Sequence, residues 1–69
     1  MRDWLKEARL QKPLTQKQMA NELGISEAYY SLIENGERQQ NMDISLAIKI
    51  GNILGMNLQE IANAEEAKT

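Results

Sequence analysis

Three serine hydroxyls, those of Ser26, Ser31 and Ser45, are the first candidates for chemistry because serine is a common enzymatic nucleophile. A serine needs a neighbouring base to take its proton, and histidine, the commonest such base, is absent from the chain. Each serine also has a simpler explanation as a helix cap or as a helix-surface residue. We therefore expect that the protein is not an enzyme.

The composition also restricts which cofactors the protein can bind and in which compartment it is expected. Without cysteine or histidine, the chain lacks the ligands of most zinc sites and cannot form a disulfide. No apolar run approaches the length of a membrane span, and the first residues lead into an amphipathic helix rather than a signal peptide. We expect a cytoplasmic protein with no cofactor, no metal, no small-molecule ligand and no membrane association.

Two short capped helices around a glycine turn are predicted in the first half of the chain. Thr15 followed three residues later by Gln18 is a capping box, so a helix begins directly after Thr15. Gly24 ends this helix, since glycine adopts a left-handed conformation without steric cost. Ser26 then caps a second helix, which ends at the Asn35-Gly36 pair. So short a turn forces the helices to cross steeply, as in a helix-turn-helix, and leaves the outer face of the second helix free to project.

Three further helices are predicted outside this motif. One covers residues 3–11. Asp43 caps another, which Gly55 ends, and Asn57 with Glu60 forms a second capping box that begins the last helix. With no strand pattern, the sequence predicts an all-α fold of five helices.

The helix after Asp43 is predicted to be largely buried. Its apolar residues span more than one face: Ile44, Ala47, Ile48, Ile50 and Leu54. Gly51 lies in its middle at a cost of about 1 kcal/mol relative to alanine, so a neighbouring helix is expected to approach closely there. We expect a single domain over residues 1–62 and a polar tail over residues 63–69 that frays.

An ordered set of motifs resembles the phage repressor and Cro family, also called the XRE-type helix-turn-helix. The set comprises Leu5, Ala8, Arg9, Leu14-Thr15-Gln16, Met19-Ala20, Leu23-Gly24-Ile25-Ser26, Ile33-Glu34-Asn35-Gly36, Ile50, Leu54-Gly55 and Leu58-Gln59-Glu60-Ile61. The resemblance covers most of the chain and implies a compact, lambda-repressor-like domain of bacterial or phage origin. Proline stands at position 13, where the family usually has glycine, so the connection there is expected to differ locally.

The resemblance also implies the residues of a binding site for double-stranded DNA. The implied DNA-binding set is Thr15, Gln16, Lys17, Ser26, Glu27, Ala28, Tyr29, Ser31, Leu32, Asn35, Arg38 and Gln39. Beneath it, Arg9 and Glu34 are expected to pair and to tie the first helix to the third. Gln16 is expected on a backbone phosphate at a helix N-terminus, and Lys17 either assists it or is a solvated charge.

The second helix of the motif would enter the major groove with its outer face. Ser31 can hydrogen-bond to several bases, whereas Ala28 and Leu32 can offer only apolar contact, for instance with a thymine methyl group. Glu27 can accept a hydrogen bond from cytosine but repels phosphates. Tyr29 either donates its hydroxyl to a phosphate or partly covers the core.

The loop after this helix departs from the family pattern. Family members grip phosphates there with backbone amides and basic side chains, a role that falls here to Asn35 and Arg38. Gln39 and Gln40 stand where many relatives have lysine or arginine, and Glu37 adds a negative charge.

The overall charge is low for a DNA-binding protein. Eight basic and ten acidic residues give a net charge of −2, and residues 1–40 alone balance at six against six. A monomer should therefore bind DNA weakly and with a shallow salt dependence, whereas a homodimer on two half-sites would gain by avidity. An apolar group of Met42, Met56 and Leu58 suits dimer contacts, although gap-filling in the core is favoured for the methionines.

These observations favour a sequence-specific, duplex-DNA-binding transcriptional regulator, acting as a repressor and as a dimer. The alternative keeps the fold and makes it a protein-interaction module, such as an antitoxin or an accessory regulator. The weakly basic outer face with exposed Ala28 and Leu32 motivates that alternative.

Overall fold

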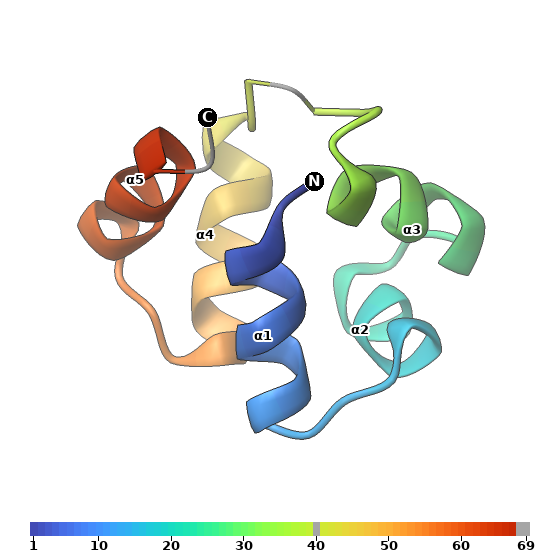
Figure 1. Cartoon of the computed structure of the whole chain (residues 1–69). Helices are drawn as coiled ribbons and strands as arrows, with labels where there is room; N and C mark the ends of the chain where they lie inside the picture. Colours follow the sequence, from blue (N-terminus) through green and yellow to red (C-terminus); the bar gives the residue numbers. More distant parts are fainter. Residues whose placement is uncertain (40, 68–69) are drawn as a thin grey trace.

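The computed structural model describes residues 1–39 and 41–67, and this part of the chain folds into five helices without a strand (Figure 1). The helices are α1 (Asp3–Gln11), α2 (Gln16–Leu23), α3 (Glu27–Asn35), α4 (Ile44–Leu54) and α5 (Leu58–Ala67). The predicted all-α, five-helix fold class is confirmed.

Local capping chemistry sets the helix ends. The Thr15 hydroxyl accepts a hydrogen bond from the Gln18 N–H at 3.0 Å, and the Gln18 side chain accepts one from the Thr15 N–H at 2.8 Å. Ser26 and Asp43 cap α3 and α4 in the same way, each accepting an N–H from three residues ahead. Gly24 ends α2 at a φ of 73°, a left-handed conformation that favours glycine.

The core lies where the five helices converge. It consists of Leu5, Met19, Ala20, Leu23, Tyr30, Ile33, Ala47, Ile50 and Ile61. Figure 1 shows α2 and α3 together on one side of the molecule and α5 on the other, with α1 and α4 between them. Because α4 packs against both α2 and α5, it joins the two sides. Among the described residues, no helix has the length and apolarity needed to cross a membrane.

The prediction that α4 is largely buried is wrong for two of its residues. Ile44 and Ile48 are 67% and 48% exposed, while Ala47 and Ile50 are buried. In helical projection Ala47 and Ile50 lie within the buried stripe of α4, and Ile44 and Ile48 lie at its edge. An apolar edge of α4 is therefore left at the surface.

The close approach predicted at Gly51 is present. The Met56 N–H donates to the Gly51 carbonyl at 2.9 Å, and a Cβ at position 51 would collide with the Met56 carbonyl oxygen and press on the Ile61 side chain. The neighbour is thus the chain entering α5 together with α5 itself. This contact explains a glycine in the middle of a helix.

The C-terminal segment and the connection between α1 and α2 both have features that were not predicted from the sequence. The prediction of a fraying tail is wrong for residues 63–67, because α5 continues through Ala67 and Glu65 is held by Arg2 and Trp4. Lys68 and Thr69 lie outside the described residues. Between α1 and α2, the Lys12–Pro13 peptide bond is cis, and the Leu14 N–H donates to the Arg9 carbonyl at 2.8 Å.

Candidate nucleic-acid interface

Helix α3 has a buried inner face and a more exposed outer face. Its inner face buries Tyr30, Ile33 and Glu34. Its outer face presents the residues predicted to meet DNA bases, with Glu27 and Ala28 exposed and Ser31 and Leu32 half-buried. The structure therefore brings these four side chains onto one face beside α2, as the helical spacing predicted.

A buried ion pair fixes α3 against α1. Arg9 Nε donates to Glu34 Oε2 at 2.8 Å and Arg9 Nη2 donates to Glu34 Oε1 at 3.2 Å, a two-point contact between residues that are 6% and 1% exposed. Arg9 Nη1 also donates to the Leu14 carbonyl at 2.6 Å. The expected Arg9–Glu34 pair is present. The Arg9 guanidinium thereby bonds both α3, through Glu34, and the segment that leads into α2, through Leu14.

The surroundings of this pair shift its pKa values. Burial works to raise the pKa of the Glu34 carboxyl, but the hydrogen bonds that surround it, led by that from Arg9, outweigh burial and hold the pKa below its ordinary value. The hydrogen bond to Glu34 raises the pKa of Arg9. Tyr30, also buried here, has its pKa raised well above the usual range, chiefly by desolvation. The pair is therefore fully charged near neutral pH.

The start of α2 carries three predicted DNA contacts. The Thr15 hydroxyl accepts the cap hydrogen bond and keeps its own proton as a donor. Lys17 is exposed. The Gln16 side-chain amide instead donates to Glu34 Oε1 at 3.2 Å, so Gln16 is half-buried and partly engaged with the ion pair.

The first backbone N–H groups of the loop after α3 donate hydrogen bonds to carbonyls of α3. Gly36 N–H donates to the carbonyls of the last turn of α3, and Glu37 and Arg38 N–H both donate to the Leu32 carbonyl, at 2.9 and 3.2 Å. Phosphate contact through these three amides, as the resemblance implied, does not fit this arrangement. The side chains of Asn35 and Arg38, both exposed, are hydrogen-bond donors at this end of α3.

Gln39 orders the loop rather than projecting from it. Its Nε2 donates to the Tyr29 hydroxyl at 3.1 Å, and its Oε1 accepts the Asp43 N–H at 3.2 Å. The backbone of Gln39 is left-handed, with a φ of 54°. Tyr29 packs against the core and keeps its hydroxyl proton as a donor, so both suggestions for this residue fit its position. Gln40 lies outside the described residues.

The charge of this surface is balanced. The exposed cations Lys17 and Arg38 are matched by the exposed acids Glu27 and Glu37. The described residues hold no group of three or more acidic side chains that could bind a metal ion. The surface thus offers hydrogen-bond donors and a small apolar area rather than a strong positive field.

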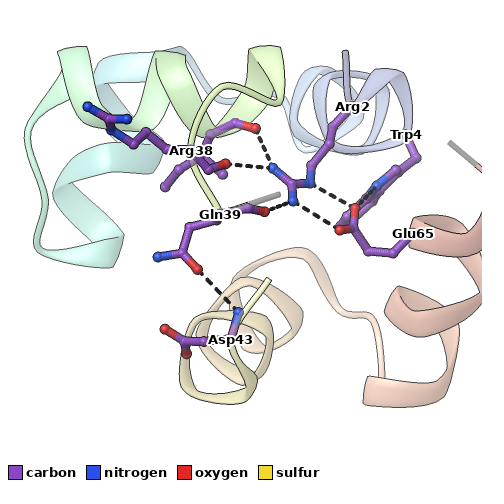
Figure 2. A network of polar contacts seen from close by, with 7 residues as sticks. Arg2, Trp4, Arg38, Gln39, Asp43 and Glu65 are labelled. Atoms are coloured by element: carbon purple, nitrogen blue, oxygen red, sulfur yellow. Dashed lines mark hydrogen bonds and ion pairs between the residues drawn. The ribbon is translucent and has the colours of Figure 1, made fainter. Parts of the chain in front are cut away.

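Arg2 and Glu65 were not predicted from the sequence to have a role near this surface. Arg2 is completely buried, and Figure 2 shows its guanidinium between Glu65 and the backbone of Arg38 and Gln39. Arginine at the start of a helix gives no signal of burial, because this residue type lies almost always at the surface. Only the tertiary structure brings together partners 36, 37 and 63 positions apart.

Comparison with known proteins identifies the motif. A family model described as helix-turn-helix matches residues 5–61. Two proteins of Bacillus subtilis (strain 168) are similar to the chain. YqaF, an uncharacterized HTH-type transcriptional regulator, is 46% identical over 57 residues, which are 83% of this chain and 72% of YqaF. YqaE, of the same description, is 41% identical over 61 residues, which are 88% of this chain and 51% of YqaE. No solved structure matches the chain.

Proposed function

Since this chain belongs to the XRE-type helix-turn-helix family of DNA-binding transcriptional regulators, we propose that it represses transcription by binding a specific duplex site as a dimer. In this proposal α3 enters the major groove, and an occupied site blocks the polymerase sterically. Proteins of this family are typically not enzymes. A regulator of this kind works in the compartment that holds the DNA, which in a bacterium is the cytoplasm.

The observation that carries the proposal is the outer face of α3, together with exposed phosphate-contact candidates at the start of α2 and after the end of α3. Lys17 lies at the start of α2, and Asn35 and Arg38 lie at the end of α3. The cap at Ser26 and the Arg9–Glu34 pair hold this face in a fixed orientation, which base recognition requires.

Base recognition would rest on few polar groups. Ser31 is the hydrogen-bonding residue at the centre of the face, Ala28 and Leu32 supply apolar contact, and Glu27 can accept from cytosine. With Lys17 and Arg38 as the cations of each subunit, a dimer would make about four charged phosphate contacts. The plot of log affinity against log salt concentration should then have a slope of about −3 to −4.

A dimer has a suitable surface between α4 and α5. A groove of about 450 Å³ lies there, lined by Asn41, Met42, Ile44, Ala47, Leu58, Ile61, Ala62, Glu65 and Glu66. Two of its lining residues, Ile44 and Leu58, are 67% and 46% exposed, so large apolar side chains meet solvent here. Met56 lies apart from this groove, beside Trp4 and Leu54. We propose that a second copy covers the groove and sets two half-sites about 34 Å apart.

Selection of bound duplexes from a random library, followed by a salt titration of the selected site, tests the function. A two-fold symmetric site bound with the stated slope is expected. Lys17→Ala with Arg38→Ala should weaken binding about a hundredfold per subunit, whereas Lys49→Ala, an exposed lysine of α4, should not. If no sequence is enriched, the DNA-binding proposal fails, and the apolar residues of the α3 face favour the protein-interaction alternative.

The dimer has a separate test. Leu58→Lys should convert the protein to a monomer in sedimentation experiments and weaken binding to the two-fold site, because a charge would enter the apolar contact. Gln59→Lys changes the exposed neighbour on α5 and is the matched control. A dimer that survives Leu58→Lys unchanged would place the interface elsewhere.

A further inference from the structure

Arg2 joins three parts of the molecule through a fully buried guanidinium group. Nε and Nη2 donate to the two carboxylate oxygens of Glu65 on α5, at 2.8 and 3.0 Å. Nη1 donates to the carbonyl of Ile33 at 2.7 Å and to that of Arg38 at 3.2 Å, and Nη2 also donates to the carbonyl of Gln39. The same residue's backbone N–H donates to the Glu34 carbonyl at 2.8 Å. Arg2 and Glu65 together form a clamp.

The clamp completes the end of α3. The last carbonyls of a helix have no partner inside the helix and carry its negative dipole end, so a cation placed there is doubly favourable. Arg2 supplies a donor to two consecutive carbonyls of this turn, those of Ile33 and Glu34. The end of the proposed recognition helix is thus held by the N-terminus of the chain.

The clamp also holds the loop that follows. The carbonyls of Arg38 and Gln39 point inward to the guanidinium, as Figure 2 shows, while the Arg38 side chain extends away from it. The Arg38 N–H is already bonded to the Leu32 carbonyl. Both polar groups of the Arg38 backbone are thus bonded, the carbonyl to the clamp and the N–H to α3. Because the backbone is held in this way, the direction in which the Arg38 side chain leaves the loop is set in part by the clamp.

Glu65 anchors the clamp on the far side. Its carboxylate accepts from Arg2 and from the indole N–H of Trp4 at 2.8 Å, and its side chain is only 16% exposed. The Glu65 carboxylate therefore links α5 to the start of α1, through Trp4, and to the Arg2 guanidinium that holds the loop.

We propose that Arg2 is a positioning residue for DNA binding: with Glu65 it sets the loop so that the Arg38 side chain meets a backbone phosphate, without touching DNA itself. This inference rests on the proposed function and names a residue outside the DNA-contacting set. It predicts that removing the clamp disables Arg38 while Arg38 is still present.

A double-mutant cycle on the full chain tests the clamp. The affinity for the selected duplex and its salt slope are measured for wild type, Arg2→Met, Arg38→Ala and the double variant, at a temperature where circular dichroism shows each to be folded. In the wild-type background, Arg38→Ala should weaken binding about tenfold per subunit and reduce the salt slope by about 1 per subunit. In the Arg2→Met background, the same change should cost much less, and Arg2→Met alone should already show the flatter slope.

One further measurement and one replacement variant keep the test decisive. Hydrogen exchange of the Glu37 and Arg38 amides, without DNA, should speed up in Arg2→Met relative to amides of α2. If Arg2→Met does not fold, Glu65→Gln replaces it in the cycle, because it removes the negative charge that anchors the Arg2 guanidinium on α5. Its matched control is Glu7→Gln, an exposed acid of α1.

The outcomes separate the two proposals. If wild type binds its site and Arg38→Ala costs the same in both backgrounds, Arg2 is structural and the clamp proposal is wrong. If wild type selects no DNA, the proposed function fails and the positioning role falls with it.

Discussion

Replacing Glu34 by glutamine should destabilise the domain severely at neutral pH. The Glu34 carboxylate is 1% exposed and accepts two hydrogen bonds from Arg9 and one from Gln16. Glutamine keeps the shape but removes the negative charge, so the Arg9 cation stays buried without its counterion. Breaking a buried pair from one side costs about 3–5 kcal/mol.

That cost is large for a chain of this size. At about 0.05–0.15 kcal/mol per residue, a domain of 69 residues has a total stability of about 3–10 kcal/mol. Glu34→Gln should therefore remove a third or more of it. Removing both charges with Arg9→Met and Glu34→Leu should cost far less than the two single changes added together, because apolar groups of similar volume can replace a buried pair.

Urea unfolding followed by circular dichroism measures these free energies for wild type, for Glu34→Gln, for the single variants Arg9→Met and Glu34→Leu, and for the double variant that combines these two. Glu37→Gln, an exposed acid in the loop after α3, is the control and should change stability by less than about 0.5 kcal/mol. If Glu34→Gln costs no more than this control, or if the double variant loses the full sum of Arg9→Met and Glu34→Leu, the buried pair does not stabilise the fold in this way.

Three other predictions follow from the contacts described. Because the pKa of Glu34 is lower in the folded chain than in the unfolded one, its stabilisation is complete above its ordinary value of 4.5 and is lost as the pH falls below that. Urea titrations from neutral pH to pH ~3 should therefore show a steeper loss for wild type than for Glu34→Gln. Gly51→Ala should lower the free energy of unfolding, since a collision with the Met56 carbonyl costs about 1–3 kcal/mol against a helix-propensity gain of about 1, while Asn52→Ala should be neutral or stabilising. Ser26→Ala should lower it by about 1 kcal/mol through loss of the α3 cap, and an unchanged melting temperature, as expected for exposed Ser45→Ala, would contradict the capping argument.

The helix boundaries were predictable because capping is local chemistry. Thr15 and Gln18 satisfy each other's backbone N–H groups across three residues, and Asn57 and Glu60 do the same at 2.9 and 2.8 Å. The outward positions of α3 follow from helical phase alone once its cap at Ser26 is known. This part of the candidate site needed no tertiary information.

What the sequence did not predict depends on which elements meet in space. The exposure of Ile44 and Ile48 depends on how the other helices pack around α4, which the apolar pattern of α4 alone does not contain. The burial of Arg2 requires acceptors from α3, its loop and α5 at one point. Gln39 is polar and lies in a loop, but its bonds to Tyr29 and Asp43 arise only when α3 and α4 are packed.

The separation of the two faces of α3 has a consequence for how such proteins diversify. The buried side, with Tyr30, Ile33 and Glu34, makes the core and ion-pair contacts that stabilise the fold. Ala28, at the opposite surface, takes part in none of the capping or ion-pair contacts described. Side chains on that surface can be exchanged with little loss of stability. A single scaffold can therefore acquire new targets by changing a handful of codons, and selection for a new target need not compete with selection for a folded chain.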